Sequence, residues 1–264
     1  MRGIILAAGQ GRRLQGVIGQ HPKCLARVGA HTLIERQLTA LRECGITAIT
    51  VVAGYGAAEV RRVCGSQVDI VRNPRFGSTN SLYSFWLARD QLRDGFVVLN
   101  ADVLFHGQLL VDLMTARYED ALLLGAPADG AQYSDEEMKV CVRANRVVEI
   151  AKTIDPLAAD GENVGIAKFG RTGAALLVEE ADRLIAAGAV REWFPSALAA
   201  FSRRRPLHVV ESRGFPWIEI DCPEDYWRAC SEVLGAIDAL AEPRPAPAAA
   251  RTAAFHSRRT AHHV

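Results

Sequence analysis

Short apolar runs alternate with helical periods through the first 100 residues of the chain. The apolar runs lie at 3–7, 48–53, 68–71 and 96–100, and the helical periods at 32–44, 57–64 and 79–91. A capping box of Thr32 and Glu35 marks the start of the first helix, and Gly45 marks its end. Repetition of strand, helix and strand predicts a mostly parallel, doubly wound α/β sheet with helices on both faces. Ligands of such sheets bind beyond the carboxyl ends of the strands.

From about residue 120 the rhythm changes to strands joined by short turns. Strand-like runs lie at 121–127, 138–142, 146–152, 163–169, 206–212 and 217–221, and helical periods at 171–188, 192–202 and 223–240. Residues 143–146 read as a hairpin connection, so we expect a small antiparallel portion beside the parallel sheet. The simplest organisation is one domain over residues 1–242, with halves of about 1–118 and 119–242.

The composition excludes a disordered chain and a generic nucleic-acid binder. Of the 264 residues 49% are hydrophobic, and the formal net charge is +1. Residues 243–264 hold four arginines and no acid; without those four, 27 Lys and Arg stand against 30 Asp and Glu. The segment 243–264 is rich in Pro, Ala and Arg and has no apolar period, which predicts a disordered tail.

Nothing in the sequence indicates secretion or membrane insertion. No signal peptide is recognisable, and no apolar run approaches the ~20 residues that span a bilayer. The six cysteines form no Cys-x-x-Cys pair, so free thiols in a reducing compartment are expected. We therefore predict a cytoplasmic protein, monomer or homodimer, with no membrane or nucleic-acid partner.

A glycine-rich loop follows the first predicted strand. Gly9 and Gly11 would let backbone N–H groups approach a phosphate chain closely. The loop meets neither the dinucleotide fingerprint nor the P-loop pattern, but Arg12 and Arg13 follow at once and Lys23 comes shortly after Pro22. Cations in and just after such a loop suit a triphosphate.

The segment "LAAGQGRRL…HPKCL" resembles the signature of the nucleotidyltransferases that join an NTP to a phosphorylated small molecule. The later segments "VVAGYGAAEV", "NPRFGSTNSLYSFWLARD", "VVLNADVLF", "GENVGIAKF" and "WIEIDCPEDYWRA" follow in the order of the phosphocholine cytidylyltransferase-like branch. The resemblance covers about residues 3–235. Arg12 stands where Ser or Thr is usual, and Cys24 stands where Ala is usual. The resemblance implies a nucleotidyltransferase or glycosyltransferase-A type fold, with a nucleotide-binding first half and an acceptor-binding second half.

Carboxylates at two strand ends are candidates for Mg²⁺, which prefers one or two carboxylates together with phosphate oxygens and water. Asp102 follows the strand at 96–100, and the resemblance implies that the residue at this position binds the metal. Strand alternation puts Glu219 and Asp221 on one face. The family pattern favours Asp221, with Glu219 as the alternate. Asn100 stands where a second Asp is frequent in the family.

The resemblance also implies roles in catalysis and in nucleotide binding. Lys23 would approach the α-phosphate, and Arg13 would hold the β- and γ-phosphates that leave as pyrophosphate. No general base is needed, because the attacking phosphate or phosphonate is already ionised at neutral pH. The predicted nucleotide-binding residues are Leu6, Ala7, Ala8, Gly9, Gly11, Arg12, Gly54, Tyr55, Asn80 and Ser81. CTP is the expected nucleotide, although the residue chemistry does not exclude UTP.

The acceptor is less defined by the sequence. The candidate residues are Lys152, Glu162, Asn163, Trp193 and Trp217. By resemblance Lys152 would bind the acceptor phosphate. The two tryptophans would suit the quaternary ammonium of a phosphocholine-like acceptor, although core packing is an equally good interpretation of either. An aminoalkyl- or hydroxyalkylphosphonate is equally compatible.

The leading hypothesis is therefore a Mg²⁺-dependent cytidylyltransferase for a small phosphate or phosphonate acceptor. Within enzymes, the alternatives are a sugar-1-phosphate or inositol-phosphate nucleotidyltransferase using another NTP, a glycosyltransferase of similar fold, and a guanylyltransferase for a molybdopterin-type acceptor. Outside enzymes, a non-catalytic nucleotide sensor could keep the same loop. Release of pyrophosphate separates the nucleotidyltransferases from the glycosyltransferase and from the sensor.

Overall fold

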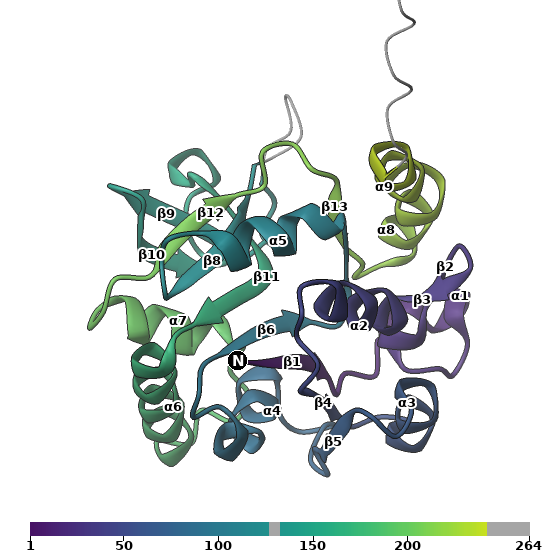
Figure 1. Cartoon of the computed structure of the whole chain (residues 1–264), viewed down its shortest axis with the longest axis horizontal. Helices are drawn as coiled ribbons and strands as arrows, with labels where there is room; N and C mark the ends of the chain where they lie inside the picture. The colour runs from purple at the N-terminus through teal and green to yellow at the C-terminus, as the bar shows by residue number, and fades with distance from the viewer. Residues whose placement is uncertain (127–132, 242–264) are drawn as a thin grey trace, which may run out of the picture.

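The computed structural model describes residues 1–126 and 133–241, so the tail predicted at 243–264 lies outside the described residues. Nine of the described strands form one sheet in the order β5-β4-β1-β6-β11-β8-β12-β10-β9 (Figure 1). An additional pairing joins β9 to β11. The sheet therefore continues from the first half of the chain into the second without interruption.

The first half of the chain forms a four-stranded parallel layer. In spatial order its strands are β5 (Asp69–Arg72), β4 (Ile49–Ala53), β1 (Arg2–Ala7) and β6 (Phe96–Asn100). All three pairings between them are parallel. Every residue of β4 is buried, which is the pattern of a strand covered on both faces. This confirms the parallel arrangement predicted from the alternation in the first 100 residues.

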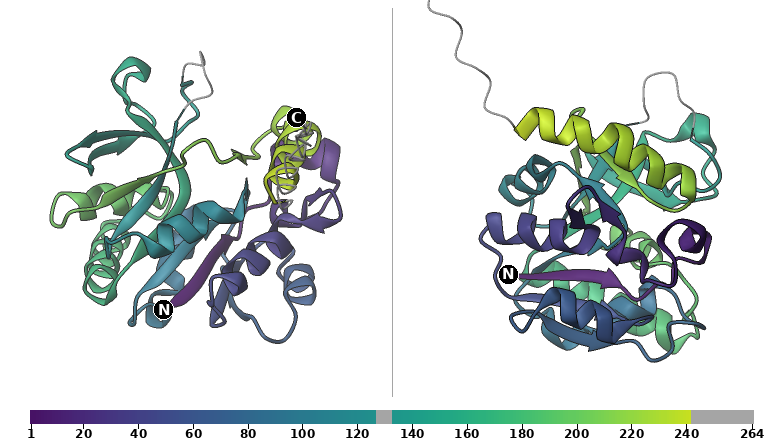
Figure 2. Two further views of the ribbon diagram at one scale, coloured as in Figure 1. Left: turned by 45° about the horizontal axis from the view of Figure 1, so that its top comes forward. Right: turned by 90° about the vertical axis from the view of Figure 1, so that its right-hand side faces the viewer.

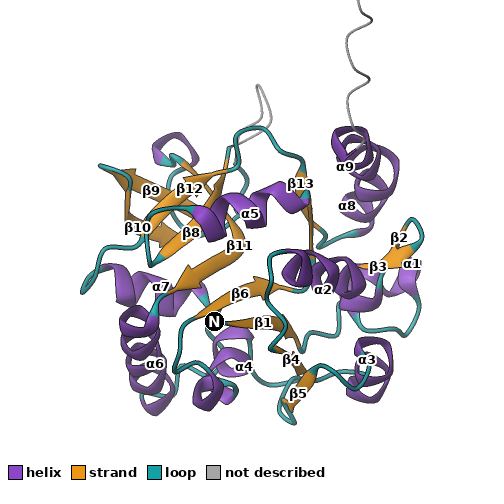
Figure 3. Cartoon of the chain, viewed as in Figure 1, coloured by secondary structure: helices purple, strands orange, loops and turns teal. Residues whose placement is uncertain are grey.

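Helices cover both faces of the sheet (Figure 3). On one face lie α2 (Leu33–Glu43), α3 (Ala57–Cys64) and α5 (Gly107–Thr115), and on the other α4 (Ser81–Leu87), α6 (Arg171–Ala186) and α7 (Pro195–Ser202). Ile5 of β1 packs with the first group and Ile4 with the second. Neighbouring residues of a strand point to opposite faces, so one short apolar run supplies both cores.

The second half of the chain is largely antiparallel. Its strands are β8 (Ala121–Gly125), β9 (Lys139–Arg143), β10 (Arg146–Ala151), β11 (Gly161–Phe169) and β12 (His208–Glu211). Among these five described strands only β8 and β12 pair in parallel. The pairing of β9 with both β10 and β11 closes the five strands into a ring.

The prediction of a mostly parallel sheet with a small antiparallel portion thus fits the first half alone. Among the pairings of this sheet four are parallel and five are antiparallel, which makes it mixed. The physical reason is connection length. A parallel pair needs a crossover of a dozen or more residues, whereas β9 and β10 are joined by Ala144 and Asn145 alone.

Two short ribbons and the last helices complete the described fold. The ribbons pair β7 (Val103–Phe105) with β13 (Trp217–Glu219), and β2 (Arg27–Val28) with β3 (His31–Thr32). The chain ends in α8 (Pro223–Arg228), a π-helical turn (Ala229–Val233) and α9 (Leu234–Ala241). These last helices pack beside the N-terminal segment that includes α1 (Gln15–Ile18), through Leu14, Ile18 and Leu234 (Figure 2).

Local signals in the sequence predicted several element boundaries. Thr32 caps α2, and both hydrogen bonds of its capping box with Glu35 are present. The hairpin turn at Ala144 and Asn145 has positive φ angles at both residues, as in the type I′ turns that commonly join two antiparallel strands. Helix α5 was not predicted. Among the described residues, no helix is long and apolar enough to cross a membrane.

Candidate active site

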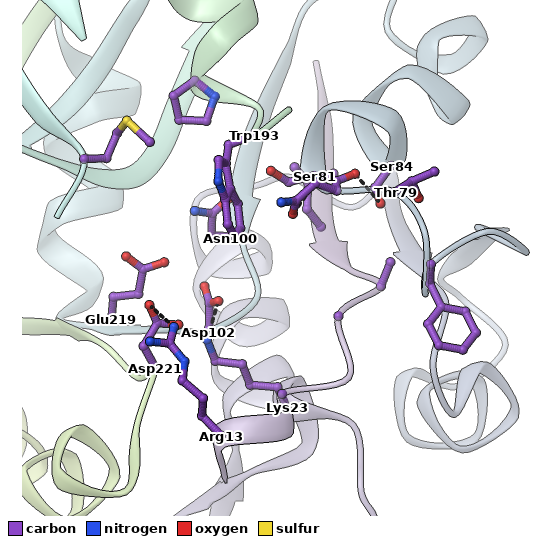
Figure 4. A pocket seen from close by; sticks show the side chains of 18 of the residues that line it. Arg13, Lys23, Thr79, Ser81, Ser84, Asn100, Asp102, Trp193, Glu219 and Asp221 are labelled. Carbon is purple, nitrogen blue, oxygen red and sulfur yellow. Dashed lines mark hydrogen bonds and ion pairs between the residues drawn. The ribbon is translucent and has the colours of Figure 1, made fainter. Parts of the chain in front are cut away.

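A cavity of about 370 Å³ opens beyond the carboxyl ends of β1 and β6 (Figure 4). It is lined by both halves of the chain. The predicted site residues that line it are Leu6, Ala8, Gly9, Gly11, Arg12, Arg13, Lys23, Asn80, Ser81, Asp102, Lys152, Asn163, Trp193, Glu219 and Asp221. The structure thus brings together residues predicted for catalysis, nucleotide, metal and acceptor.

The glycine-rich loop connects β1 to a short 3-10 turn at Arg12–Leu14. Gly11 has a φ of +66°, and a Cβ at this position would lie 2.7 Å from the Cβ of Lys23. Both the backbone angle and the close approach require glycine. No atom lies within 4 Å of the corresponding position at Gly9, so this part of the loop is open. The loop therefore packs tightly against Lys23 and leaves space beside Gly9.

Lys23 bridges two of the predicted metal ligands. Its Nζ lies 2.7 Å from Asp102 Oδ2 and 2.5 Å from Asp221 Oδ1, and its side chain is 13% exposed. Burial opposes the charge on Lys23, but the carboxylates of Asp102 and Asp221 outweigh this effect and raise the pKa of the ammonium above its ordinary value. Lys23 therefore stays protonated across the physiological pH range.

The ribbon of β7 and β13 brings Asp102 and Asp221 together. Val103 pairs with Glu219 in this ribbon, and the Ile220 amide donates a hydrogen bond to the Asp102 carbonyl at 3.0 Å. Burial opposes the charge of Asp221, but Lys23 and then Arg13 outweigh it and lower the pKa of this carboxyl. Asp221 is therefore ionised at neutral pH. Both carboxylates thus face one ammonium from strands far apart in the sequence.

Glu219 completes a group of three carboxylates. One oxygen from each of Asp102, Glu219 and Asp221 lies within 4.8 Å of the others. Burial, followed by the charges of Asp102 and Asp221, raises the pKa of Glu219 well above its ordinary range. The carboxylate Oδ1 of Asp102 is buried and has no hydrogen-bond partner among the described residues. An all-oxygen donor set with one unpartnered atom fits a hard divalent cation such as Mg²⁺.

Arg13 and Lys152 meet the same glutamate across the cavity. Arg13 lies 3.2 Å from Asp221 and 3.7 Å from Glu136, and Lys152 lies 3.4 Å from the same oxygen of Glu136. The Lys152 ammonium also lies 5.4 Å from the ring centroid of Trp193, whose side chain is half-exposed. Arg13, predicted to bind the nucleotide phosphates, and Lys152, predicted to bind the acceptor, therefore face the same part of the cavity.

The start of α4 forms another wall of the cavity. Asn80 caps this helix by accepting from the Ser81 amide at 3.0 Å. The Ser81 hydroxyl accepts from the amide of Phe194 at 2.8 Å, which fixes the position of the neighbouring Trp193. Asn73 is buried below this wall and donates to Thr79 and Ser84, both at 3.1 Å. These polar groups are held in place before any ligand binds.

Five predicted site residues do not line the cavity: Ala7, Gly54, Tyr55, Glu162 and Trp217. Ala7 points into the core. The Tyr55 hydroxyl donates to the Gln20 carbonyl at 2.9 Å, and the ring of Trp217 packs over Gly125. Burial, followed by the charge of Glu137, raises the pKa of Glu162 to about 8.

The cavity also contains residues that the sequence analysis did not select as site residues. They are Asn73, Phe76, Thr79, Ser84, Asn100, Glu136, Met138 and Pro195. Asn73 directly follows β5 and Asn100 is the last residue of β6, so their position at the carboxyl ends of parallel strands was a usable signal. Nothing local marked Glu136 or Met138, because the segment before β9 reaches the cavity only through the closure of the second half.

Residues 3–212 match the family model described as the MobA-like NTP transferase domain. The chain belongs to this family. The MobA-like NTP transferases are nucleotidyltransferases, so the predicted resemblance and enzyme class are confirmed. The matched range includes Arg13, Lys23 and Asp102, whereas Glu219 and Asp221 lie beyond it. In this MobA-like chain the ribbon of β7 and β13 adds those two carboxylates to the site.

Several proteins of known name are similar to this MobA-like chain. The choline-phosphate cytidylyltransferase of Streptococcus pneumoniae is 27% identical over 243 residues, 89% of this chain and 98% of that protein. The bifunctional IPC transferase and DIPP synthase of Rubrobacter xylanophilus is 30% identical over 88% of this chain but 51% of that protein. The solved inositol-1-phosphate CTP transferase from T. maritima has a TM-score of 0.75 and 22% identity, covering 91% of this chain and 96% of that one. This likeness shows the α/β nucleotidyltransferase fold.

Proposed function

We propose that the protein is a Mg²⁺-dependent cytidylyltransferase that joins CTP to a small phosphate or phosphonate acceptor and releases pyrophosphate. The observation that carries this proposal is the Lys23 ammonium held between Asp102 and Asp221 beside the glycine-rich loop. A buried cation next to a carboxylate cluster suits a reaction in which charge builds up on a phosphorus centre. The cavity of about 370 Å³ is large enough for a substantial ligand.

In this proposal Lys23 and Arg13 act on the triphosphate. Lys23 stabilises the charge that develops on the α-phosphate during attack. Arg13 is more exposed, and its guanidinium would hold the β- and γ-phosphates that leave together. The attacking phosphate oxygen is already ionised at neutral pH, so the residues supply position and charge rather than a general base.

Asp102 and Asp221 are the proposed holders of Mg²⁺, with Glu219 as the alternate. Bound Mg²⁺ would supply further positive charge to the phosphates and help orient them. Lys23 keeps the two aspartates close together without the ion, because their mutual repulsion is offset by one shared cation. Burial, followed by the charges of Asp102 and Asp221, raises the pKa of the Glu219 carboxyl, which makes it the least favoured ligand of the three.

The nucleotide half of the proposal depends on the wall formed by the loop and by α4. Ala8, Gly9, Asn80 and Ser81 face the cavity there and remain the proposed nucleotide-binding residues. The preference for CTP is supported by relatives that carry cytidylyltransferase or CTP in their names, including the CTP:phosphoglutamine cytidylyltransferase of Campylobacter jejuni. UTP remains the competing nucleotide to be tested.

The acceptor half of the proposal depends on Lys152, Asn163 and Trp193. The Lys152 ammonium can bind a phosphate or phosphonate, and the Trp193 ring offers an apolar surface beside it. Named relatives include a choline-phosphate cytidylyltransferase and a CMP-5'-(3-aminopropyl)phosphonate synthase, which supports a small phosphorus-containing acceptor. A sugar-1-phosphate or inositol phosphate is the alternative acceptor class, and the T. maritima inositol-1-phosphate CTP transferase favours testing it.

We also propose a cytoplasmic location, because all six cysteines are free thiols in the structure and a reducing compartment keeps thiols free. We propose no membrane or nucleic-acid partner. Two alternatives explain the site less well. A glycosyltransferase binds no triphosphate, so it does not account for the cations of Arg13 and Lys23. A non-catalytic sensor does not account for the group of three carboxylates.

Measurement of pyrophosphate release tests the proposal. Each of the four NTPs should be incubated with Mg²⁺ and a panel of acceptors comprising phosphocholine, 2-aminoethylphosphonate, a hydroxyalkylphosphonate, inositol phosphate and hexose 1-phosphates. We expect release with CTP and one acceptor, and its loss in Lys23→Ala and Asp102→Ala. Arg61→Ala, which removes an exposed cation of α3, is the control and should behave as the wild type. Nucleotide binding without turnover on any acceptor would favour the sensor, and no nucleotide binding would refute both hypotheses.

A further inference from the structure

A second cavity, of about 420 Å³, lies between the β9–β10 hairpin turn and the connection from α7 to β12. Five of its ten lining residues are arginines and none is acidic: Arg143, Arg146, Arg203, Arg204 and Arg205. We call this cavity the arginine groove. Its elements lie at the left edge of Figure 1, whereas α1 of the glycine-rich segment lies at the right edge. The groove shares no lining residue with the candidate active site.

The hairpin places two like charges directly opposite each other. Arg143 and Arg146 are register partners in the antiparallel pair of β9 and β10. Like charges in this position destabilise a hairpin when nothing neutralises them. The turn between them is also held with positive φ at Ala144 and Asn145, which is unusual for alanine. The hairpin therefore carries two positive charges in a position that does not stabilise the fold.

The arginines of the groove differ in their partners. Arg204 pairs with Glu179 and Glu180, both at 2.6 Å, and Arg205 pairs with Asp120 at 2.5 Å. Arg143, Arg146 and Arg203 are exposed and form no ion pair with any residue in 1–126 or 133–241. Outside the segment 243–264 acids outnumber bases, so this concentration of cations does not reflect the general composition.

We propose that the arginine groove is a second anion site that binds a diphosphate group. The guanidinium groups of Arg143, Arg146 and Arg203 can each form two parallel hydrogen bonds to phosphate oxygens. Together the three groups carry a charge of +3, which balances inorganic pyrophosphate at neutral pH more closely than it balances a monophosphate of about −1.5. The diphosphate can be inorganic pyrophosphate or part of a nucleotide. The proposal does not depend on the proposed catalytic function.

Calorimetric titration of the full chain with inorganic pyrophosphate, without Mg²⁺, tests this proposal. We expect two bound pyrophosphates per chain, one in the candidate active site and one in the groove. Arg143→Ala/Arg146→Ala should reduce this number to one or weaken the second site by about ten-fold or more. Arg61→Ala/Arg228→Ala is the matched control, because it removes the same charge from exposed arginines of α3 and α8 without ion pairs in the described structure.

A second titration separates the groove from the candidate active site. In Arg13→Ala/Lys23→Ala the groove should still bind pyrophosphate, and Arg143→Ala/Arg146→Ala in that background should abolish it. A parallel titration with CDP identifies the source, because tighter binding of CDP assigns the site to a nucleotide and tighter binding of pyrophosphate to the inorganic ion. Pyrophosphate binding that is unchanged in Arg143→Ala/Arg146→Ala, or weakened equally by the control pair, would overturn the proposal.

Discussion

Lys23 and Asp221 form an ion pair of 2.5 Å although 198 positions separate them in the sequence. The same ammonium lies 2.7 Å from Asp102, so three charged groups from three parts of the chain meet at one point. Asp102 directly precedes β7 and Asp221 lies two residues after β13, so the β7–β13 ribbon positions both carboxylates. The candidate chemistry is therefore tied to the packing of this ribbon against the glycine-rich segment.

Removal of the ammonium should remove most of the activity. Lys23→Ala is expected to lower kcat/KM for pyrophosphate release by about 10²–10³-fold, as loss of one transition-state donor does. Lys23→Arg should recover little, because a planar guanidinium cannot replace a compact ammonium between two aspartates. Arg61→Ala, on exposed α3, controls for loss of a positive charge. Activity within two-fold of wild type in Lys23→Ala would contradict the assigned role.

Removal of the metal should abolish turnover reversibly. We expect EDTA to stop pyrophosphate release and added Mg²⁺ to restore it. Asp102→Asn keeps the shape of the side chain but removes its charge, so more Mg²⁺ should be needed for half-maximal rate. The Mg²⁺ titration should be unchanged in Asp238→Asn, which alters an exposed carboxylate on α9. An identical titration in Asp102→Asn would place the metal elsewhere.

The loop glycine that contacts Lys23 should be intolerant of a side chain. Gly11→Ala combines left-handed backbone strain of about 1–2 kcal/mol with a clash against Lys23. Gly45 has a similar positive φ, but a Cβ added there would have no atom within 4 Å. Gly45→Ala therefore measures the strain alone. Urea unfolding should show a larger loss for Gly11→Ala, and only this variant should lose activity.

The pH dependence of stability should include a contribution from Glu162. Burial, then the charge of Glu137, raises its pKa from 4.5 to about 8 in the folded protein. Between these values only the folded state keeps the proton, so the free energy of unfolding falls as pH rises from about 4.5 to about 8. Below this window the group has no differential effect, and above it the loss is complete.

Glu162→Gln should remove this part of the slope. Relative to wild type, the variant is expected to gain stability as pH rises from 5 to 8, measured by urea unfolding at several pH values. Glu149→Gln, on the exposed side of neighbouring β10, is the matched control and should follow the wild type. Parallel curves for wild type and Glu162→Gln would show that the Glu162 carboxyl does not hold its proton.

Substitution of Lys152 should raise KM for the acceptor more than KM for CTP. Lys152→Ala removes the cation that faces Trp193 and Glu136, so KM for the acceptor should rise by about ten-fold or more while KM for CTP changes little. Lys152→Arg keeps the charge and should recover part of the affinity. Steady-state kinetics with each substrate varied in turn would show this split. Equal effects on both substrates would assign Lys152 to the nucleotide.

The sequence alone predicted the features that depend on neighbouring residues. The period of apolar residues predicted the four strands of the parallel layer and the helices α2, α3 and α4 in their order, but not α1 or α5. The pattern at Thr32 and Glu35 predicted the start of α2. The glycine loop with its cations, and a carboxylate at a strand end, pointed to the correct enzyme family. These signals are local, because side-chain periodicity and capping involve residues within a few positions of each other.

Only the tertiary structure decided which distant segments meet. It closed β9 onto β11, packed Trp217 over Gly125 outside the cavity, and brought Glu136 between Arg13 and Lys152. It also set Arg143 opposite Arg146 and placed Arg203 across the groove from them. Such contacts follow from strand register and from the fit of particular side chains across the sheet. No local period in the sequence encodes them, because they depend on the packing of the whole chain.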